Sequence, residues 1–259
     1  MLLRAALIFY LKLKSIWKPY GYFGNYSSWE EAVKNSGSYD SESILQKVLD
    51  ASELVRDQKA TFERDGIAFQ EAFEWEALAY FKQIAVPGQT LRILDFGGAL
   101  GSHYFPVAAK LSDVHFDWTI IEQEAFVTLG KAGFAAEKLH FSADLKETLS
   151  SAKFDMVLLG CVLPYLQDPY AILARILDAG PRYILIDKHP VIHKTNDRLT
   201  VQRIPPDIYP ASYPAWFFAE KKFLHFMEGY ELAGSYDCPD VYNINSVFKT
   251  YFYRLKQGT

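Results

Sequence analysis

The chain has 259 residues, of which 50% are hydrophobic, so it can form a sizeable core around one α/β domain with an added subdomain. Its formal net charge is -4, with 27 basic and 31 acidic residues, which argues against a nucleic-acid-binding protein because such proteins carry excess basic residues. Two cysteines, Cys161 and Cys238, are too few for a disulfide scaffold. We therefore expect a cytoplasmic globular protein whose partners do not include nucleic acid.

Residues 1–17 are apolar and basic and contain no acidic residue. The uncharged run at 5–11 is far shorter than the ~20 residues that a membrane-spanning helix needs. No small-residue cleavage site follows, as a secretory signal would require. Two interpretations stay open: a helix in peripheral contact with the inner face of a membrane, or a helix that covers the domain.

Residues 28–81 have helical periodicity. Ser28 and Glu31 have the S-x-x-E spacing of a capping box, and apolar residues recur along one face of the following segment. Pro87 and Gly88 end this pattern. We expect a helical extension over residues 1–85 and a second domain over residues 86–259.

From Leu91 onward, short apolar strands alternate with helical stretches. The predicted strands are 91–95, 117–122, 138–142, 154–160, 182–187, 230–236 and 246–255. The predicted helices are 101–111, 124–132, 145–152 and 169–178. Alternation of this kind predicts a Rossmann-like, mostly parallel, seven-stranded sheet with right-handed crossovers.

A glycine-rich turn follows the first of these strands. Asp95 ends the strand, and Gly97, Gly98 and Gly101 allow the backbone to turn sharply and to approach a ligand closely. The next helix directs its free N–H groups toward the same place. Since ligands of open parallel sheets bind outside the carboxyl ends of the strands, the turn predicts a nucleotide pocket.

The acidic residues at the strand ends favour an adenosyl cofactor. Glu122, after the second strand, can accept both ribose hydroxyls, and Asp144, after the third, can accept from an adenine amino group. Asp95 would repel a pyrophosphate but attract the ammonium of a methionine moiety. A dinucleotide site also needs G-x-G-x-x-G, and here that register gives Gly97, Ala99 and Ser102. Alternatively, Asp95 and Asp144 only cap the helices that follow them.

At these residues the chain resembles a class I S-adenosylmethionine (SAM)-dependent methyltransferase. More narrowly, it resembles a bacterial family of inferred methyltransferases that is similar in arrangement to enzymes encoded among surface-polysaccharide and O-antigen genes. The resemblance rests on residues 17–22, 28–32, 64–65, 95–98, 122–123, 162–169 and 209–216. Ala99 is a departure, because it stands where these sites commonly carry their middle glycine.

The resemblance implies SAM as cofactor and no metal. The cofactor contacts that it implies are Asp95, Gly97, Gly98, Gly101, Glu122, Gln123, Asp144, Gly160 and Cys161. By association it implies a sugar or other small-molecule acceptor. It leaves the oligomeric state undetermined.

Methyl transfer to a hydroxyl is helped by a general base. His189, just beyond the fifth predicted strand, is the candidate base, and Asp187 would orient its imidazole or position the acceptor. Tyr165, after the fourth strand, would exclude water near the transferred methyl group. Each of the three can instead be a packing or surface residue. We expect the proline- and aromatic-rich insert at about 188–218 to form an acceptor wall or lid, or an oligomer contact.

The sequence therefore predicts a SAM-dependent methyltransferase that methylates an oxygen of a sugar or surface-polysaccharide precursor. One alternative is a non-catalytic module that keeps the SAM fold as a scaffold or regulator of surface-glycan assembly, which Ala99 keeps open. The other alternative, an NAD-dependent oxidoreductase, is disfavoured by the broken glycine register.

Overall fold

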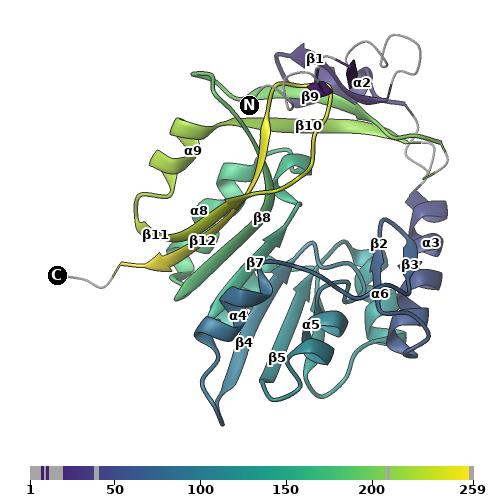
Figure 1. The fold of residues 1–259 in the computed structure, drawn as a ribbon, viewed down its shortest axis with the longest axis vertical. Helices are drawn as coiled ribbons and strands as arrows, with labels where there is room; N and C mark the ends of the chain where they lie inside the picture. The colour runs from purple at the N-terminus through teal and green to yellow at the C-terminus, as the bar shows by residue number, and fades with distance from the viewer. Residues whose placement is uncertain are drawn as a thin grey trace. The chain divides into compact units, whose positions relative to one another are not determined.

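The structure is a computed structural model, and it describes residues 7–8, 10–11, 20–37, 41–206, 208 and 211–256. Most of the predicted N-terminal helix, and part of the predicted insert, lie outside these residues. Figure 1 shows the course of the chain. The chain divides into two compact units, of which the first comprises residues 1–40, 161–172 and 186–259, and the second 41–160 and 173–185. The division expected at residue 85 stays a prediction.

The second unit contains the parallel sheet that the sequence predicts. Its strands are β4 (Thr90–Phe96), β5 (His115–Ile121), β6 (Leu139–Ser142) and β7 (Met156–Gly160), hydrogen-bonded in the order β6-β5-β4-β7. The helices between them are α5 (Tyr104–Lys110), α6 (Glu124–Gly133) and α7 (Leu145–Ser151). Strand order reverses between β4 and β7, so the carboxyl end of β4 lies at a topological switch point, where such sheets bind ligands.

The core of this unit consists of apolar residues from the strands, among them Ile93, Leu94, Ile120 and Leu158, all of which are completely buried. Strands that are buried on both faces are continuous apolar runs in the sequence. For this reason the positions of these strands were predicted well from the sequence. The register places Asp95 beside Ile120 on one side and beside Leu158 on the other. The backbone of Asp95 is thus held by both neighbouring strands.

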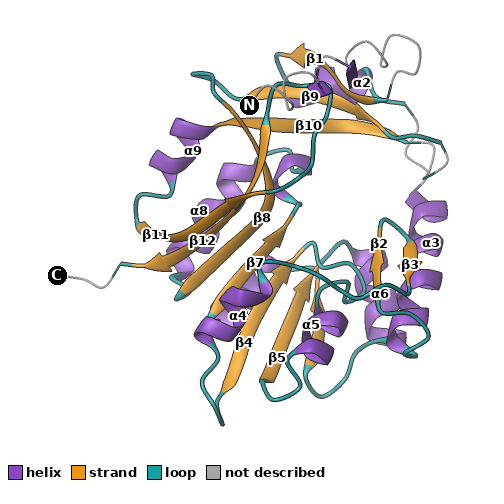
Figure 2. Ribbon diagram, viewed as in Figure 1, coloured by secondary structure: helices purple, strands orange, loops and turns teal. Residues whose placement is uncertain are grey.

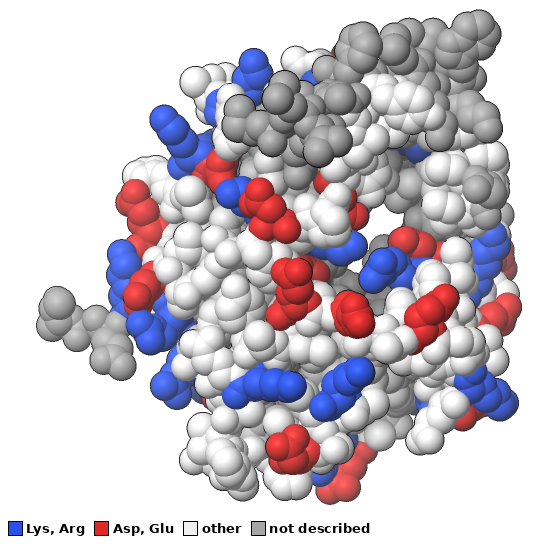
Figure 3. Space-filling view, viewed as in Figure 1, with Lys and Arg blue, Asp and Glu red and all other residues white. Residues whose placement is uncertain are grey.

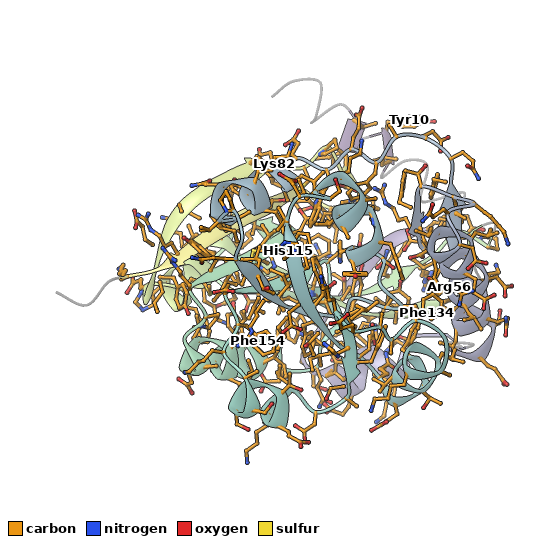
Figure 4. All side chains as sticks on the ribbon, turned by 90° about the horizontal axis from the view of Figure 1, so that it is seen from below. Tyr10, Arg56, Lys82, His115, Phe134 and Phe154 are labelled. Atoms are coloured by element: carbon orange, nitrogen blue, oxygen red, sulfur yellow. The ribbon has the colours of Figure 1, made fainter. Side chains whose placement is uncertain are left out.

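The region before β4 in this unit is less helical than predicted. It contains α3 (Ser41–Arg56) and α4 (Leu78–Ile84), but between them β2 (Phe62–Arg64) and β3 (Ile67–Phe69) form a two-stranded hairpin. Arg56, at the end of α3, lies over the Phe134 ring and donates to the carbonyl of Gly133, which ties α3 to α6 (Figure 4). Strands of three residues are too short to leave a periodic signal in the sequence.

The first unit is largely antiparallel (Figure 2). It contains β1 (Gly21–Tyr26), β9 (Arg198–Arg203) and β10 (Ser212–Ala219) in the order β1-β9-β10, together with β11 (Tyr230–Asp237) paired with β12 (Val247–Leu255). Its helices are α2 (Trp29–Lys34), α9 (Glu220–Phe226) and a 3-10 turn, Leu163–Tyr165. The elements α8 (Pro169–Ala179) and β8 (Tyr183–Ile192) each have residues in both units.

The predicted capping box forms at the start of α2, with one change. Ser28 accepts the N–H of Glu31 at 3.2 Å, as expected. The Glu31 carboxylate turns back to Ser27 instead of Ser28, and accepts its N–H at 2.8 Å and its hydroxyl at 2.7 Å. These hydrogen bonds lower the pKa of Glu31.

The sequence predicts seven strands in the sheet, but in the described part of the chain the sheet contains ten strands. The additional strands are β1, β9 and β10, and the latter two occupy part of the predicted proline- and aromatic-rich insert. Pro214 lies within β10 although it has no N–H to donate to a neighbouring strand. It is tolerated because β10 pairs with β8 only at Phe218 and Ala219, so that only β9 is hydrogen-bonded alongside Pro214.

On the face shown in Figure 3, basic and acidic residues are interspersed. Among the residues that the structure describes, no helix is both long and apolar enough to cross a membrane.

Candidate cofactor site

The glycine-rich turn after β4 has the backbone geometry that its sequence predicts. Gly97 and Gly101 have positive φ angles, of 80° and 104°. A Cβ atom on Gly98 would lie 2.5 Å from Oδ2 of Asp95, so a side chain at this position would collide with the carboxylate. Ala99, the predicted departure, also has a positive φ, of 50°. This alanine therefore has a left-handed backbone conformation that favours glycine.

Asp95 is the only carboxylate of this turn, and it is completely buried. Its Oδ2 accepts from the indole Nε1 of Trp118 at 3.3 Å and lies 3.3 Å from Nδ1 of His103. Its Oδ1 has no hydrogen-bond partner among the described residues. A buried carboxylate oxygen with no partner is costly, and a donor from a ligand would satisfy it.

Glu122 lies beside this turn, directly after β5. Its Oε1 accepts the N–H of Ala99 at 3.3 Å, and its Oε2 accepts the N–H of Gln123 at 2.8 Å. Burial raises the pKa of this half-buried carboxyl, the two N–H groups oppose that shift, and the charge of Asp95 adds to it. Because each carboxylate oxygen can accept more than one hydrogen bond, both oxygens retain capacity for ligand hydroxyls.

Asp144 caps helix α7, as the alternative interpretation expected. Its Oδ1 accepts the N–H of Glu147 at 2.8 Å. The residue is exposed at the carboxyl end of the sheet, beyond β6. A contact between Asp144 and an adenine ring stays a prediction, as does a contact made by the exposed Gln123.

A second buried carboxylate lies near the turn, and no sequence pattern indicates it. Glu63, on β2, accepts the N–H of Gly66 at 2.8 Å and a hydrogen bond from the hydroxyl of Ser102, the residue that follows Gly101. Burial raises the pKa of Glu63. Only the tertiary structure reveals this contact, since 39 residues separate Glu63 and Ser102 in the chain.

His103 completes the surroundings of Asp95. Its ring stacks on Trp75, with 5.2 Å between ring centroids and 25° between planes. A Cβ atom on Gly160, at the end of β7, would lie 2.4 Å from Cε1 of this ring. The glycine at position 160 therefore leaves the space that His103 occupies.

The remaining predicted site residues belong to the first unit. Cys161 has a φ of 53° and donates its N–H to the carbonyl of Asp187 at 3.0 Å. The carboxylate of Asp187 is buried and accepts a hydrogen bond from the hydroxyl of Thr250. Neither Cys161 nor Cys238 forms a disulfide bond.

The structure corrects the place of His189. It lies within β8, not in a loop beyond the strand, and its side chain is almost completely buried. Its ring packs between Phe218 and Phe223, at centroid distances of 4.2 Å and 4.0 Å, and neither ring nitrogen has a hydrogen-bond partner among the described residues. Burial lowers its pKa to about 3. These surroundings do not favour a general base, because the imidazole cannot readily accept a proton.

Tyr165 belongs to a group of phenols in the first unit. A hydrogen bond joins its hydroxyl to that of Tyr22, and its ring contacts Tyr213 edge to face at 5.3 Å. Tyr22 in turn contacts Tyr242 at 5.1 Å. Burial raises the pKa of both Tyr22 and Tyr165 well above the usual value, so these phenols stay protonated at neutral pH. The predicted position of Tyr165 near the transferred methyl group stays a prediction.

No cluster of histidine, cysteine or carboxylate side chains suited to a metal ion occurs within the described ranges.

Comparison with known proteins adds evidence on the fold. No family model matches the chain, and no curated protein matches its sequence. Among solved structures, the [4+2]-cyclase SpnF is similar, with a TM-score of 0.53, 13% identity, and coverage of 91% of this chain and 98% of the other. This similarity shows that the two chains share a fold. The N-terminal domain of EvdMO1, with a TM-score of 0.50 and 16% identity, covers 85% of this chain over its own full length.

A third similar structure is a protein from Listeria monocytogenes, assigned as a SAM-dependent methyltransferase. It has a TM-score of 0.50 and 10% identity, and the match covers 69% of this chain and 97% of the other. At these identities the comparisons establish the Rossmann-like fold of class I methyltransferases for this chain, which agrees with the fold class predicted from its sequence.

Proposed function

We propose that this protein is a SAM-dependent methyltransferase whose cofactor binds to the second unit, at the carboxyl ends of β4 and β5. The observation that carries the proposal is the contact between the glycine-rich turn and Glu122, made through the N–H of Ala99 at 3.3 Å. It brings the two acids, Asp95 and Glu122, to one switch point of the sheet.

The residues at this point fit such a cofactor. Gly98 leaves a space beside Asp95 that any side chain would fill, and Asp95 has a buried oxygen without a partner in the described part of the chain. Asp95 would hold the ammonium of the methionine moiety, and Glu122 the ribose hydroxyls. A pyrophosphate would meet two carboxylates here, which disfavours NAD.

When bound, SAM supplies an electrophilic methyl group on a sulfonium with a good leaving group. The work left to the protein is to orient donor and acceptor and to exclude water. The backbone turn at Gly97 to Gly101 and the rigid end of β4 would orient the cofactor, because β4 is held by both neighbouring strands. Gly160, at the end of β7 in the same unit, is proposed to line this site. The cofactor contact expected of Cys161, which belongs to the first unit, stays a prediction.

For the acceptor, we propose a hydroxyl of a sugar or surface-polysaccharide precursor. Two observations support this class. The first unit contains the partly buried phenols Tyr165, Tyr213 and Tyr242, whose flat rings suit sugar faces. One structurally similar protein, the N-terminal domain of EvdMO1, was solved in the presence of S-adenosylhomocysteine and D-fucose.

A second candidate function uses the same fold without methyl transfer. The similar protein SpnF is a [4+2]-cyclase, so this fold also supports other chemistry. The unfavourable φ of Ala99 and the buried position of His189 favour this candidate, as a scaffold or as a catalyst of another reaction.

Calorimetric titration with S-adenosylhomocysteine tests the cofactor proposal. We expect the full chain to bind it, and Glu122→Ala to bind about tenfold or more weakly, because hydrogen bonds to a charged group contribute about 1.5–3 kcal/mol. Glu124→Ala is the matched control, since this exposed residue in the first turn of α6 should leave the affinity unchanged. Absence of binding by the unmodified chain would refute the proposal. Binding without methylation of any cell-extract glycan, measured by mass spectrometry, would support the second candidate.

A further inference from the structure

We infer that His103 is a positioning residue for the amino-acid end of the cofactor. In the structure its imidazole is the partner of Asp95, and we propose that the ligand's ammonium takes this place while His103 pairs with the ligand's carboxylate. The inference rests on the proposed function, because it assigns a residue to the same site.

The first observation is access to Asp95. Two side chains donate to or contact its Oδ2, namely Trp118 and His103. Trp118 is completely buried, whereas the side chain of His103 is 22% exposed. Because Asp95 itself has no exposed surface, a ligand reaches its carboxylate only if a neighbour moves. Of these two side chains, His103 is the one in contact with solvent.

The second observation is that the ring of His103 has a defined place. Trp75 stacks on one of its faces at 5.2 Å, and the absent side chain of Gly160 leaves room for its Cε1 edge. The ring thus extends from the carboxyl end of β4, at Asp95, to the carboxyl end of β7, at Gly160. These two strands flank the switch point of the sheet.

The third observation is the charge around the ring. Asp95 lies 3.3 Å from Nδ1, and Glu63 is close enough that the charge of His103 lowers the pKa of Glu63 against the effect of burial. A carboxylate, which accepts hydrogen bonds, and an imidazole, whose ring N–H can donate one, therefore lie side by side at the turn.

This pair matches the chemistry of an α-amino acid, in which an ammonium and a carboxylate are attached to one carbon atom. An anion alone would bind the ammonium but repel the neighbouring carboxylate. Adjacent Asp95 and His103 can receive both groups, because the carboxylate accepts hydrogen bonds from the ammonium and the imidazole N–H donates one to the ligand's carboxylate. NAD and simple nucleosides have no such end, so the pair also provides selectivity.

The test compares three ligands by calorimetry: S-adenosylhomocysteine, its decarboxylated analogue, and 5′-methylthioadenosine, which lacks the whole amino-acid end. His103→Phe retains a ring that can stack on Trp75 but removes the ring nitrogens that would donate to the ligand's carboxylate. We expect this variant to bind S-adenosylhomocysteine about tenfold or more weakly, as for loss of a charged hydrogen bond. Its affinity for the other two ligands should change less than about threefold, since neither has a carboxylate.

Tyr104→Phe, at the neighbouring position of α5, is the control and should leave all three affinities unchanged. If His103→Phe does not fold, as judged by its thermal unfolding, His103→Leu replaces it, because the leucine side chain cannot donate a hydrogen bond. Equal weakening toward all three ligands, or unchanged affinity for S-adenosylhomocysteine, would overturn the inference while the proposed function stands. If the unmodified chain binds none of the three ligands, both proposals fail.

Discussion

At the scale of single residues, Ala99 and His189 each carry a local cost. Ala99 has a left-handed backbone in the glycine-rich turn, and His189 is buried between phenylalanine rings with two ring nitrogens that have no partner in the described structure. The sequence singled out both residues, Ala99 as a departure from the motif and His189 as a base. Only the structure shows that Ala99 has a strained backbone conformation and that His189 lies in the core.

Replacing Ala99 by glycine should stabilise the protein. A left-handed conformation costs an L-residue about 1–2 kcal/mol, and the extra flexibility of glycine in the unfolded chain offsets about 0.5–1 kcal/mol of that gain. We expect the free energy of unfolding in urea to rise by about 0.5–1 kcal/mol for Ala99→Gly. Ala109→Gly, in the exposed part of α5, should instead lower it by about 1 kcal/mol. A loss of stability in Ala99→Gly would contradict the strain.

His189 should make stability depend on pH. Its pKa is about 3 in the folded protein, below the ordinary value of 6.5, so the folded state binds fewer protons than the unfolded state. The stability is fully present above pH 6.5 and falls as pH is lowered from there toward 3, by up to about 1.4 kcal/mol per pH unit. We expect His189→Leu to flatten this dependence in urea unfolding measured from pH 7 to pH 4.

Replacement of an exposed histidine serves as the control. His115, at the start of β5, lies on the surface, and His115→Gln should leave the slope of stability against pH as it is in the unmodified chain. An unchanged slope in His189→Leu would show that other groups cause the acid sensitivity.

At the scale of elements, the packing of α6 on β6 depends on one glycine. A Cβ atom on Gly130 would lie 2.4 Å from the ring of Phe141, which is buried on β6. Helix α6 therefore approaches the sheet more closely than a larger residue would permit. The amphipathic pattern of residues 124–132 predicted the helix, but not this distance from the sheet.

Two glycine substitutions in this helix should have opposite effects. We expect Gly130→Ala to lower the free energy of unfolding by about 1–3 kcal/mol, because the added methyl group overpacks the contact with Phe141. Gly133→Ala should raise it by up to about 1 kcal/mol, since a Cβ there would be at an ordinary distance from Arg56 and alanine favours the helix. Thermal unfolding of both variants measures the difference. Similar effects of the two substitutions would contradict the close approach of α6.

At the scale of the whole molecule, the alternating strands and helices from β4 onward were predicted more accurately than the antiparallel strands and the N-terminal region. Strands β4 to β7 and helices α5 to α8 lie where the periodicity placed them, because buried parallel strands are apolar throughout and the helices between them are amphipathic. Strand β8 begins near its predicted start but continues beyond residue 187, to Ile192. Strands β1, β9 and β10 were missed. Aromatic and glycine residues obscure the period of β1, and aromatic and proline residues obscure that of β10. The pairing of β1 with β9 joins segments that are far apart in the sequence.

The sequence by itself determined the Rossmann-like class, the glycine-rich turn and the acids at the strand ends, because all of these depend on local patterns and spacing. Tertiary structure alone decided which side chains surround Asp95. Glu63 and Trp75 come from segments before the sheet, and His103 reaches Gly160 across the switch point. Contacts between residues distant in the chain depend on how the elements pack, and a local sequence pattern does not predict that packing.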